Sequence, residues 1–314
     1  MRTRILVAVL GVLTILPGDA AAQTGRIQPN ADTIETIVTG GGFQPVAMYA
    51  PVFIRGQKML MQVDTGAAAT IIDSRVSREL GLAAFNKKVR IRTIGCTTKA
   101  VTVLIDEWKI GVGPIPSVKA IAIRMPGKLR EVQGLPVAGL LGADALSFFE
   151  TVGVDFRHSK LILDNPFVST PNTFKVRTAI SKDTSRPTLM VANVRIHGRR
   201  TRMAIDTGAS VSTLDRSVAR KARLEKVGRK VRVSAVSCRT SVQPVKLNGW
   251  RIGGKRAPDT IAVTRRTGLP QQSRGLLSGL IGADIFARYG KVTLDYKKLR
   301  VSLGFPRIGV APTG

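Results

Sequence analysis

A tetrapeptide that occurs twice, Asp-Thr-Gly-Ala, constrains this chain more than any other feature. The copies lie at residues 64–67 and 206–209, and an apolar residue precedes each of them. One copy of so short a motif is weak evidence, but two copies in matching contexts indicate two halves with a common architecture. If the halves pack together about a pseudo-twofold axis, Asp64 comes to lie beside Asp206.

The repeat extends well beyond the tetrapeptide. At an offset of 142 residues (64 to 206), Gly56 corresponds to Gly198 and Cys96 to Cys238. A two-residue deletion then reduces the offset to 140, and Val154-Asp155-Phe156 corresponds to Leu294-Asp295-Tyr296. Two long units are too few for a solenoid, which stacks three or more short ones. A duplication without retained chemistry leaves both copies of the tetrapeptide unexplained.

An apolar-apolar-glycine turn follows the tetrapeptide in each half. The turns comprise Leu140, Leu141, Gly142, Leu280, Ile281 and Gly282. Several aspartates also repeat, and we interpret them as structural. Asp73 and Asp215 are placed to cap the short helices expected over 74–80 and 216–224, and Asp144 and Asp284 are read as helix caps or partners of buried donors. The remaining pair, Asp155 and Asp295, lies in the final apolar strand of each half.

The first 22 residues have the composition of a signal peptide. A short basic region precedes an apolar run of about a dozen residues, and a small-residue cleavage site ends at Ala22. The apolar run is shorter than a membrane span requires, so cleavage and export to the periplasm or the medium are favoured over an uncleaved anchor. No other segment of the sequence approaches the length of a span.

Composition divides the rest of the chain. Residues 23–46 are polar and glycine-containing, and we expect a flexible leader there. Residues 164–188 have the proline-rich and polar composition of a linker. The sequence thus predicts an N-terminal lobe over 47–163, a C-terminal lobe over 189–304, and a tail over 305–314.

Within each lobe the pattern predicts strands. Short segments with partial alternation of apolar and polar residues are bounded by glycine and charged turns, and the turns at 55–58 and 197–200 are typical of hairpins. We therefore expect a mainly β fold of two pseudo-twofold-related closed β-barrel lobes, each with one or two short helices.

Two adjacent carboxylates imply a specific chemistry. At a separation of about 3 Å they cannot both ionise at ordinary pH, so Asp64 and Asp206 are expected to share one proton. The ionised partner can take a proton from an attacking water, and the protonated partner can hydrogen-bond the carbonyl oxygen. Gly66 and Gly208 leave room for a tight turn. This chemistry needs no cofactor and no metal, and His158 and His197 are read as surface residues.

Each lobe resembles a retropepsin-type aspartic peptidase unit, and the whole chain is similar to the bacterial secreted single-chain form of that superfamily. The resemblance covers about 47–163 and 189–304. It implies a catalytic dyad of Asp64 and Asp206, and hydrogen bonds from Thr65 and Thr207 to the opposite lobe. It also implies that Ala67 and Ala209, where pepsin-like enzymes usually place a hydroxyl donor, raise the pKa values of the dyad.

The resemblance places Cys96 and Cys238 in equivalent flap hairpins that meet over the active site. Both cysteines would be exposed to an oxidising compartment after export. A Cys96–Cys238 disulfide linking the flaps is one hypothesis, and two free thiols or an intermolecular bridge are the alternatives. The disulfide requires Cα atoms within about 7 Å of each other.

The chain is strongly basic, with 49 Lys and Arg against 20 Asp and Glu and a net charge of +29. This charge favours an anionic envelope surface or acidic substrates as partners. Basic residues recur in the loops before each apolar-apolar-glycine turn, including Arg124, Arg130 and Arg265. Nucleic acid is not expected, because the basic residues are dispersed and only 5% of the residues are aromatic.

The sequence thus predicts an exported aspartic endopeptidase whose peptide substrate lies in an interlobe cleft. Because one chain carries both aspartates, a monomer is sufficient to complete the site. The alternatives are a catalytically silent peptide-binding scaffold of the same fold, or a basic protein that tethers the envelope.

Overall fold

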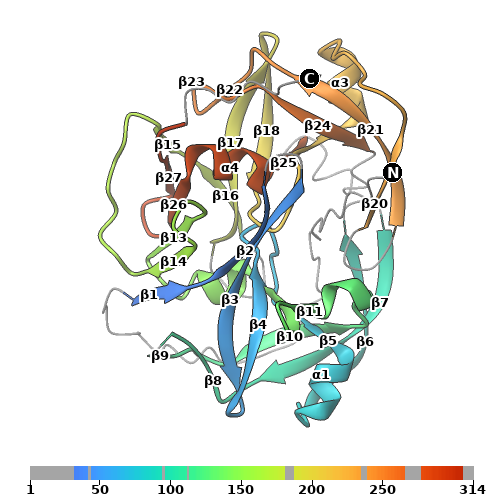
Figure 1. Cartoon of the computed structure of the whole chain (residues 1–314), viewed down its shortest axis with the longest axis vertical. Helices are drawn as coiled ribbons and strands as arrows, with labels where there is room; N and C mark the ends of the chain where they lie inside the picture. Colours follow the sequence, from blue (N-terminus) through green and yellow to red (C-terminus); the bar gives the residue numbers. More distant parts are fainter. Residues whose placement is uncertain are drawn as a thin grey trace.

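The computed structural model describes residues 32–41, 44–93, 96–111, 113–180, 187–234, 239–265 and 277–306. The chain forms two β-rich lobes, which lie below and above one another in Figure 1, and a third sheet that joins them on the left. The predicted fold class, mainly β with two repeated lobes, is confirmed.

The N-terminal lobe is built on one 11-stranded sheet. Its elements are β2 (Ile37–Gly41), β3 (Gln44–Ile54), β4 (Gln57–Val63), β5 (Ile71–Asp73), α1 (Ser74–Glu79), β6 (Ala84–Thr93), β7 (Cys96–Ile105), β8 (Trp108–Ile110), β9 (Gly113–Pro114), β10 (Val118–Ile123), the 3-10 helix η1 (Gly127–Leu129), β11 (Glu131–Val132), β12 (Leu135–Leu141) and α2 (Ala143–Leu146).

The C-terminal lobe is built on a 10-stranded sheet. Its elements are β16 (Arg177–Ile180), β17 (Pro187–Ile196), β18 (Arg199–Ile205), β19 (Thr213–Asp215), α3 (Arg216–Lys221), β20 (Val231–Ser234), β21 (Arg239–Leu247), β22 (Arg251–Ile252), β23 (Lys255–Arg256), β24 (Thr260–Arg265), β25 (Gly279–Ile281) and α4 (Ala283–Tyr289).

The two sheets have the same strand order. The N-terminal order β6-β7-β10-β5-β12-β4-β3-β8-β9 is matched, strand for strand, by β20-β21-β24-β19-β25-β18-β17-β22-β23. In both sheets the strand before the tetrapeptide, β4 or β18, pairs in parallel with the strand that carries the apolar-apolar-glycine turn, β12 or β25. The repeat in the sequence is therefore a repeat in topology.

The third sheet has six strands in the order β1-β14-β13-β26-β27-β15 and draws them from both lobes. Its strands are β1 (Asp32–Glu35), β13 (Thr151–Asp155), β14 (Lys160–Leu163), β15 (Thr173–Lys175), β26 (Lys291–Asp295) and β27 (Arg300–Leu303). The central contact is antiparallel pairing of β13 with β26, which joins the final strand segments of the two halves.

Two expectations about irregular segments are wrong. The leader expected over 23–46 contains β1, which pairs with β14, and β2, which pairs with β3. The linker expected over 164–188 contains β15 and β16, which pair with β27 and β17. Each segment completes the edge of a sheet, where main-chain pairing outweighs a local composition typical of loops. Residues 1–22, the expected signal peptide, and most of the expected tail lie outside the described residues.

The hairpins and helix caps follow the sequence prediction. The turn between β3 and β4 has Arg55 and Gly56 at φ +48° and +78°, and its counterpart has His197 and Gly198 at +44° and +79°. Two consecutive positive φ values are typical of the two-residue turns that match the twist of a hairpin. The side chain of Asp73 accepts a hydrogen bond at the start of α1, and Asp215 does so at the start of α3.

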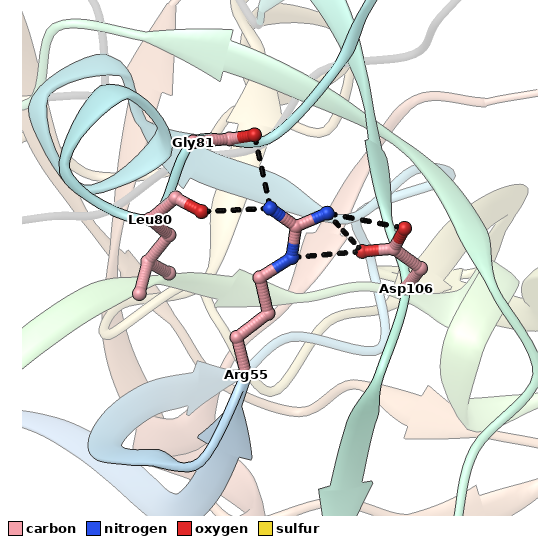
Figure 2. A network of polar contacts seen from close by, with 4 residues as sticks. All are labelled: Arg55, Leu80, Gly81 and Asp106. Atoms are coloured by element: carbon pink, nitrogen blue, oxygen red, sulfur yellow. Dashed lines mark hydrogen bonds and ion pairs between the residues drawn. The ribbon is translucent and has the colours of Figure 1, made fainter.

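The arginine of the first hairpin turn ties three parts of the N-terminal lobe together (Figure 2). Its Nε and Nη2 atoms donate to the Asp106 carboxylate, at 2.9 Å for the shortest contact, and Nη1 donates to the carbonyl oxygens of Leu80 and Gly81 at 2.9 and 3.0 Å. In the other lobe, His197 takes the place of Arg55 and contacts Ala222 O and Asn248 Oδ1. The side chain of the turn residue thus has polar partners in both lobes, but only Arg55 contacts a carboxylate.

We expect Arg55→Met to lower the free energy of unfolding by about 1–2 kcal/mol, because it removes charge-assisted hydrogen bonds that are only partly exposed. Urea denaturation measures the change. Lys58→Met, on the exposed part of the same hairpin, is the matched control, and its effect should stay within about 0.5 kcal/mol. Equal losses in the two variants would contradict this role for Arg55.

Candidate active site

Each Asp-Thr-Gly-Ala turn is held by the apolar-apolar-glycine segment of its own lobe. The amide of Asp64 donates to Leu141 O at 3.0 Å, and Ala143 N donates to Ala67 O at 2.6 Å. The second lobe repeats both contacts, from Asp206 N to Ile281 O at 3.0 Å and from Ala283 N to Ala209 O at 2.7 Å. These bonds fix the position of each aspartate relative to the core of its lobe.

The two turns are joined across the lobes by a symmetric set of hydrogen bonds. The hydroxyl of Thr65 donates to Ile205 O at 3.0 Å and accepts from Thr207 N at 3.1 Å. The hydroxyl of Thr207 donates to Val63 O at 2.9 Å and accepts from Thr65 N at 3.1 Å. All four bonds are buried, so they set the spacing of the two turns. The structure therefore brings Asp64 and Asp206 together, as the repeat predicts.

Glycine at 66 and 208 is explained by the opposing carboxyl rather than by backbone conformation. A Cβ on Gly66 would lie 2.4 Å from Asp206 Cγ, and a Cβ on Gly208 would lie 2.1 Å from Asp64 Cγ. Neither glycine has a positive φ. Each glycine of one lobe thus makes room for the aspartate of the other.

Both carboxyl groups are buried, with relative exposures of 1% for Asp64 and 0% for Asp206. Oδ1 of Asp64 accepts from Gly66 N and Ala67 N at 3.2 and 3.0 Å, and Oδ1 of Asp206 accepts from Ala209 N at 2.9 Å. In the described part of the chain, Oδ2 of each group has no hydrogen-bond partner outside the pair. Oδ1 of each aspartate is therefore anchored by its own turn, and Oδ2 is not bound by any other described residue.

Burial raises the pKa of Asp64 well above its ordinary value, and the neighbouring charge of Asp206 raises it further. Burial also raises the pKa of Asp206, to about 7, against the opposing effect of the amide of Ala209. Two carboxyls in contact titrate as a unit, so the pair keeps one proton at neutral pH. Such a pair contains a base and an acid at the same time.

Gln62 is a site residue that the sequence analysis missed. Its side-chain Nε2 donates to Gly208 O at 3.0 Å across the lobes, and the side chain is 2% exposed. The corresponding residue at the offset of 142 is Ala204, so the repeat gives no signal for it. A polar side chain within the buried strand before the first tetrapeptide is the one feature that could have identified it.

The other repeated aspartates have structural partners. Asp144 Oδ1 accepts from the amide and hydroxyl of Thr70 at 2.8 and 2.7 Å, and Asp284 Oδ1 accepts from both groups of Ser212 at 2.8 Å. Burial raises the pKa of each of these aspartates to about 6. They join the loop after each tetrapeptide to the helix that follows the apolar-apolar-glycine turn, α2 in one lobe and α4 in the other.

Asp155 and Asp295 close the turns that follow their own strands. Asp155 accepts from Arg157 N and His158 N, both at 3.0 Å, and Asp295 accepts from Lys298 N at 2.7 Å. The two histidines lie at the surface, and the described residues contain no group of three or more His, Cys, Asp or Glu that could hold a metal ion. Within the same residues, no helix is long and apolar enough to cross a membrane.

The hairpins expected as flaps are present. Strands β6 and β7 pair down to Thr93 and Cys96, and β20 and β21 pair down to Ser234 and Arg239. Both hairpins lie on the right in Figure 1, on the side away from the six-stranded sheet. Cys238 and the side chain of Cys96 lie outside the described residues, so the disulfide remains a hypothesis.

Comparisons with known proteins agree with this geometry. The fold is similar to that of the aspartic proteinase from Irpex lacteus, with a TM-score of 0.53 and 13% sequence identity over 91% of this chain and 100% of that one. A search of curated proteins found no match. The family model described as aspartyl protease matches twice, over residues 50–145 and 192–285, and each match contains one tetrapeptide and the glycine turn that supports it. The chain therefore belongs to the aspartyl protease family.

Proposed function

We propose that this protein is an aspartic endopeptidase in which Asp64 and Asp206 form the catalytic dyad. The observation that carries the proposal is the pair of buried carboxyls, held by four hydrogen bonds across the lobes, with the Oδ2 atoms unused by other described residues. Family membership supports peptidase activity in general. We assign that activity to Asp64 and Asp206.

In the proposed reaction, a water positioned between the carboxyls attacks the scissile carbonyl carbon. The ionised aspartate takes a proton from the water, and the protonated aspartate donates a hydrogen bond to the carbonyl oxygen as negative charge develops. A proton then passes to the amide nitrogen, the C–N bond breaks, and the two peptide products leave. The dyad ends with one proton, as it began.

A peptide bound in extended form between the lobes would lie under the hairpins β6–β7 and β20–β21. Main-chain hydrogen bonds from such hairpins would align the substrate with little dependence on sequence. Export after cleavage at Ala22 is part of the proposal and rests on residues 1–22. The net charge of +29 would hold the exported protein near anionic envelope surfaces.

Mass spectrometry of a diverse peptide mixture tests the proposed activity. The protein without residues 1–22 is incubated with the mixture between pH 3 and 8, with and without a reductant, because the flap cysteines can be bonded. We expect new peptide termini within internal sequences. A folded protein that cleaves nothing under any of these conditions would support the peptide-binding scaffold instead.

A further inference from the structure

One arginine of the C-terminal lobe is buried together with its guanidinium group. Arg265, the last residue of β24, is 3% exposed, and its Nη1 and Nη2 atoms are buried without a hydrogen-bond partner among the described residues. A buried guanidinium that lacks partners is costly, because it has lost its water without gaining other acceptors. Natural structures rarely keep such a group without a use for it.

Arg265 lies on the face of β24 that points toward the second tetrapeptide turn and the second flap hairpin. Residues two apart on a strand share a face, and Val263 packs with Ala209, Leu280 and Val233 in one apolar cluster. The antiparallel register of β21 with β24, which pairs Gln243 with Thr264, places Val242 of the same cluster opposite Arg265. The side chain of Arg265 therefore leaves β24 on the face that packs against the Asp206 turn.

The N-terminal lobe has an apolar residue at this position. Ile123 corresponds to Arg265 at the offset of 142, and it packs in the equivalent apolar cluster with Tyr49, Ile71 and Leu140. The registers agree, because Ile123 pairs with Asp73 in β5 and Arg265 pairs with Asp215 in β19. Since the fold packs isoleucine here, the arginine is not needed to complete the lobe.

The acidic residue that the register places opposite Arg265 has a structural role of its own. Asp215, opposite Arg265 in the register, uses Oδ1 to accept the amide of Ser217 and cap α3 at 2.8 Å. Burial lowers the pKa of Arg265 to about 10, which leaves it charged at neutral pH. At this strand position the C-terminal lobe thus carries a positive charge, where the N-terminal lobe has Ile123.

We propose that Arg265 is a specificity-determining residue whose guanidinium binds the carboxylate of an Asp or Glu side chain of the substrate. The inference rests on the proposed peptidase function and adds a substrate class to it. The planar fork of Nη1 and Nη2 suits two parallel hydrogen bonds to one carboxylate. Because the equivalent position of the other lobe is Ile123, the preference for an acidic residue applies to one side of the scissile bond.

Matched peptides that carry either glutamate or glutamine test the inference. Starting from a cleaved peptide, each position within four residues of the scissile bond is varied in turn, and kcat/KM is measured. We expect a preference for glutamate of about tenfold to a hundredfold at one position or two on one side, the range typical of hydrogen bonds to a charged group. Arg265→Ile, which copies the other lobe, should abolish the preference, and Arg265→Lys should keep part of it.

Arg199→Met is the matched control, because it removes an exposed arginine at a hairpin end away from the Asp206 turn. It should leave the preference unchanged. Equal kcat/KM for glutamate and glutamine peptides in the wild type, or a preference that survives Arg265→Ile, would overturn the inference while the peptidase proposal stood.

A binding measurement separates the two proposals further. Fluorescence anisotropy with labelled glutamate and glutamine peptides is carried out on the Asp64→Asn variant, with and without Arg265→Ile. Tighter binding of the glutamate peptide only when Arg265 is present supports the inference even if the wild type cleaves nothing. Equal binding of the two peptides refutes it whether or not cleavage occurs.

Discussion

Asp64→Asn and Asp206→Asn are each expected to reduce peptide cleavage by about a thousandfold or more, since each removes one half of the acid–base pair. An amide can neither accept the proton of the attacking water nor share a proton with the remaining carboxyl. The measurement is kcat/KM for one cleaved peptide. Glu131→Gln, which neutralises an exposed carboxylate of the N-terminal lobe, is the control and should retain full activity.

The same two variants should be at least as stable as the wild type at pH 7. The pKa of each aspartate is raised in the folded state. The contribution of the pair to stability is therefore complete only at pH values below the ordinary pKa of an aspartate. That stability is lost as the pH rises toward about 7 and the buried charge forms. Asparagine carries no charge, so thermal unfolding at pH 7 should occur at an equal or higher temperature. A variant that is both inactive and strongly destabilised would point to a structural role instead.

Gly208→Ala should abolish cleavage and also destabilise the protein, in contrast to the aspartate variants. The added Cβ would lie 2.1 Å from Asp64 Cγ, so the turn or the carboxyl has to move. Overpacking of this kind costs about 1–3 kcal/mol. Displacement of the carboxyl by even a fraction of an ångström also breaks the contact on which proton sharing depends.

The control for this prediction is Gly127→Ala, because a Cβ at Gly127 meets nothing within 4 Å and its φ is not positive. Its stability should change by no more than about 0.5 kcal/mol, and its activity should be unchanged. If Gly208→Ala kept wild-type kcat/KM and an unaltered midpoint of unfolding, the close approach of the two turns would be wrong.

The parts of the fold that repeat could be predicted from the sequence, because the same residue types occur at the same spacing in both halves. The tetrapeptide turns, the hairpins at Gly56 and Gly198, and the caps at Asp73 and Asp215 are all short-range features. For each of them, the residue types alone indicate the local conformation. The pairing of the two aspartates followed from symmetry alone.

The six-stranded sheet could not be predicted in the same way. Strand β1 pairs Ile34 with Leu161, and β15 pairs Phe174 with Val301, over separations at which local composition carries no information. Both edge strands lie in segments rich in polar residues or proline, so the composition favoured a flexible leader and a linker. The conformation of such segments is determined by main-chain hydrogen bonds to a partner strand, and only the tertiary fold determines which strand that is.

Departures from the repeat are the other features that symmetry hides. At the offset of 142 residues, Gln62 corresponds to Ala204, and Arg265 corresponds to Ile123. Each is a polar side chain at a buried strand position, and the other half of the chain gives no signal for it. Gln62 and Arg265 therefore distinguish the two lobes around a pair of aspartates that is otherwise symmetric.

The dependence of kcat/KM on pH tests the central claim, that two buried carboxyls act as one unit holding one proton. The peptide should contain no ionisable side chain, so that the profile reports the enzyme. At pH 3 both carboxyls are protonated, and the pKa of Asp206 is raised to about 7. Cleavage should therefore increase from pH 3 toward neutral pH, as the pair loses the first of its two protons. It should decrease again at the pH where the pair loses the remaining proton. A maximum near pH 2, or a rate that is constant from pH 3 to 8, would contradict the claim.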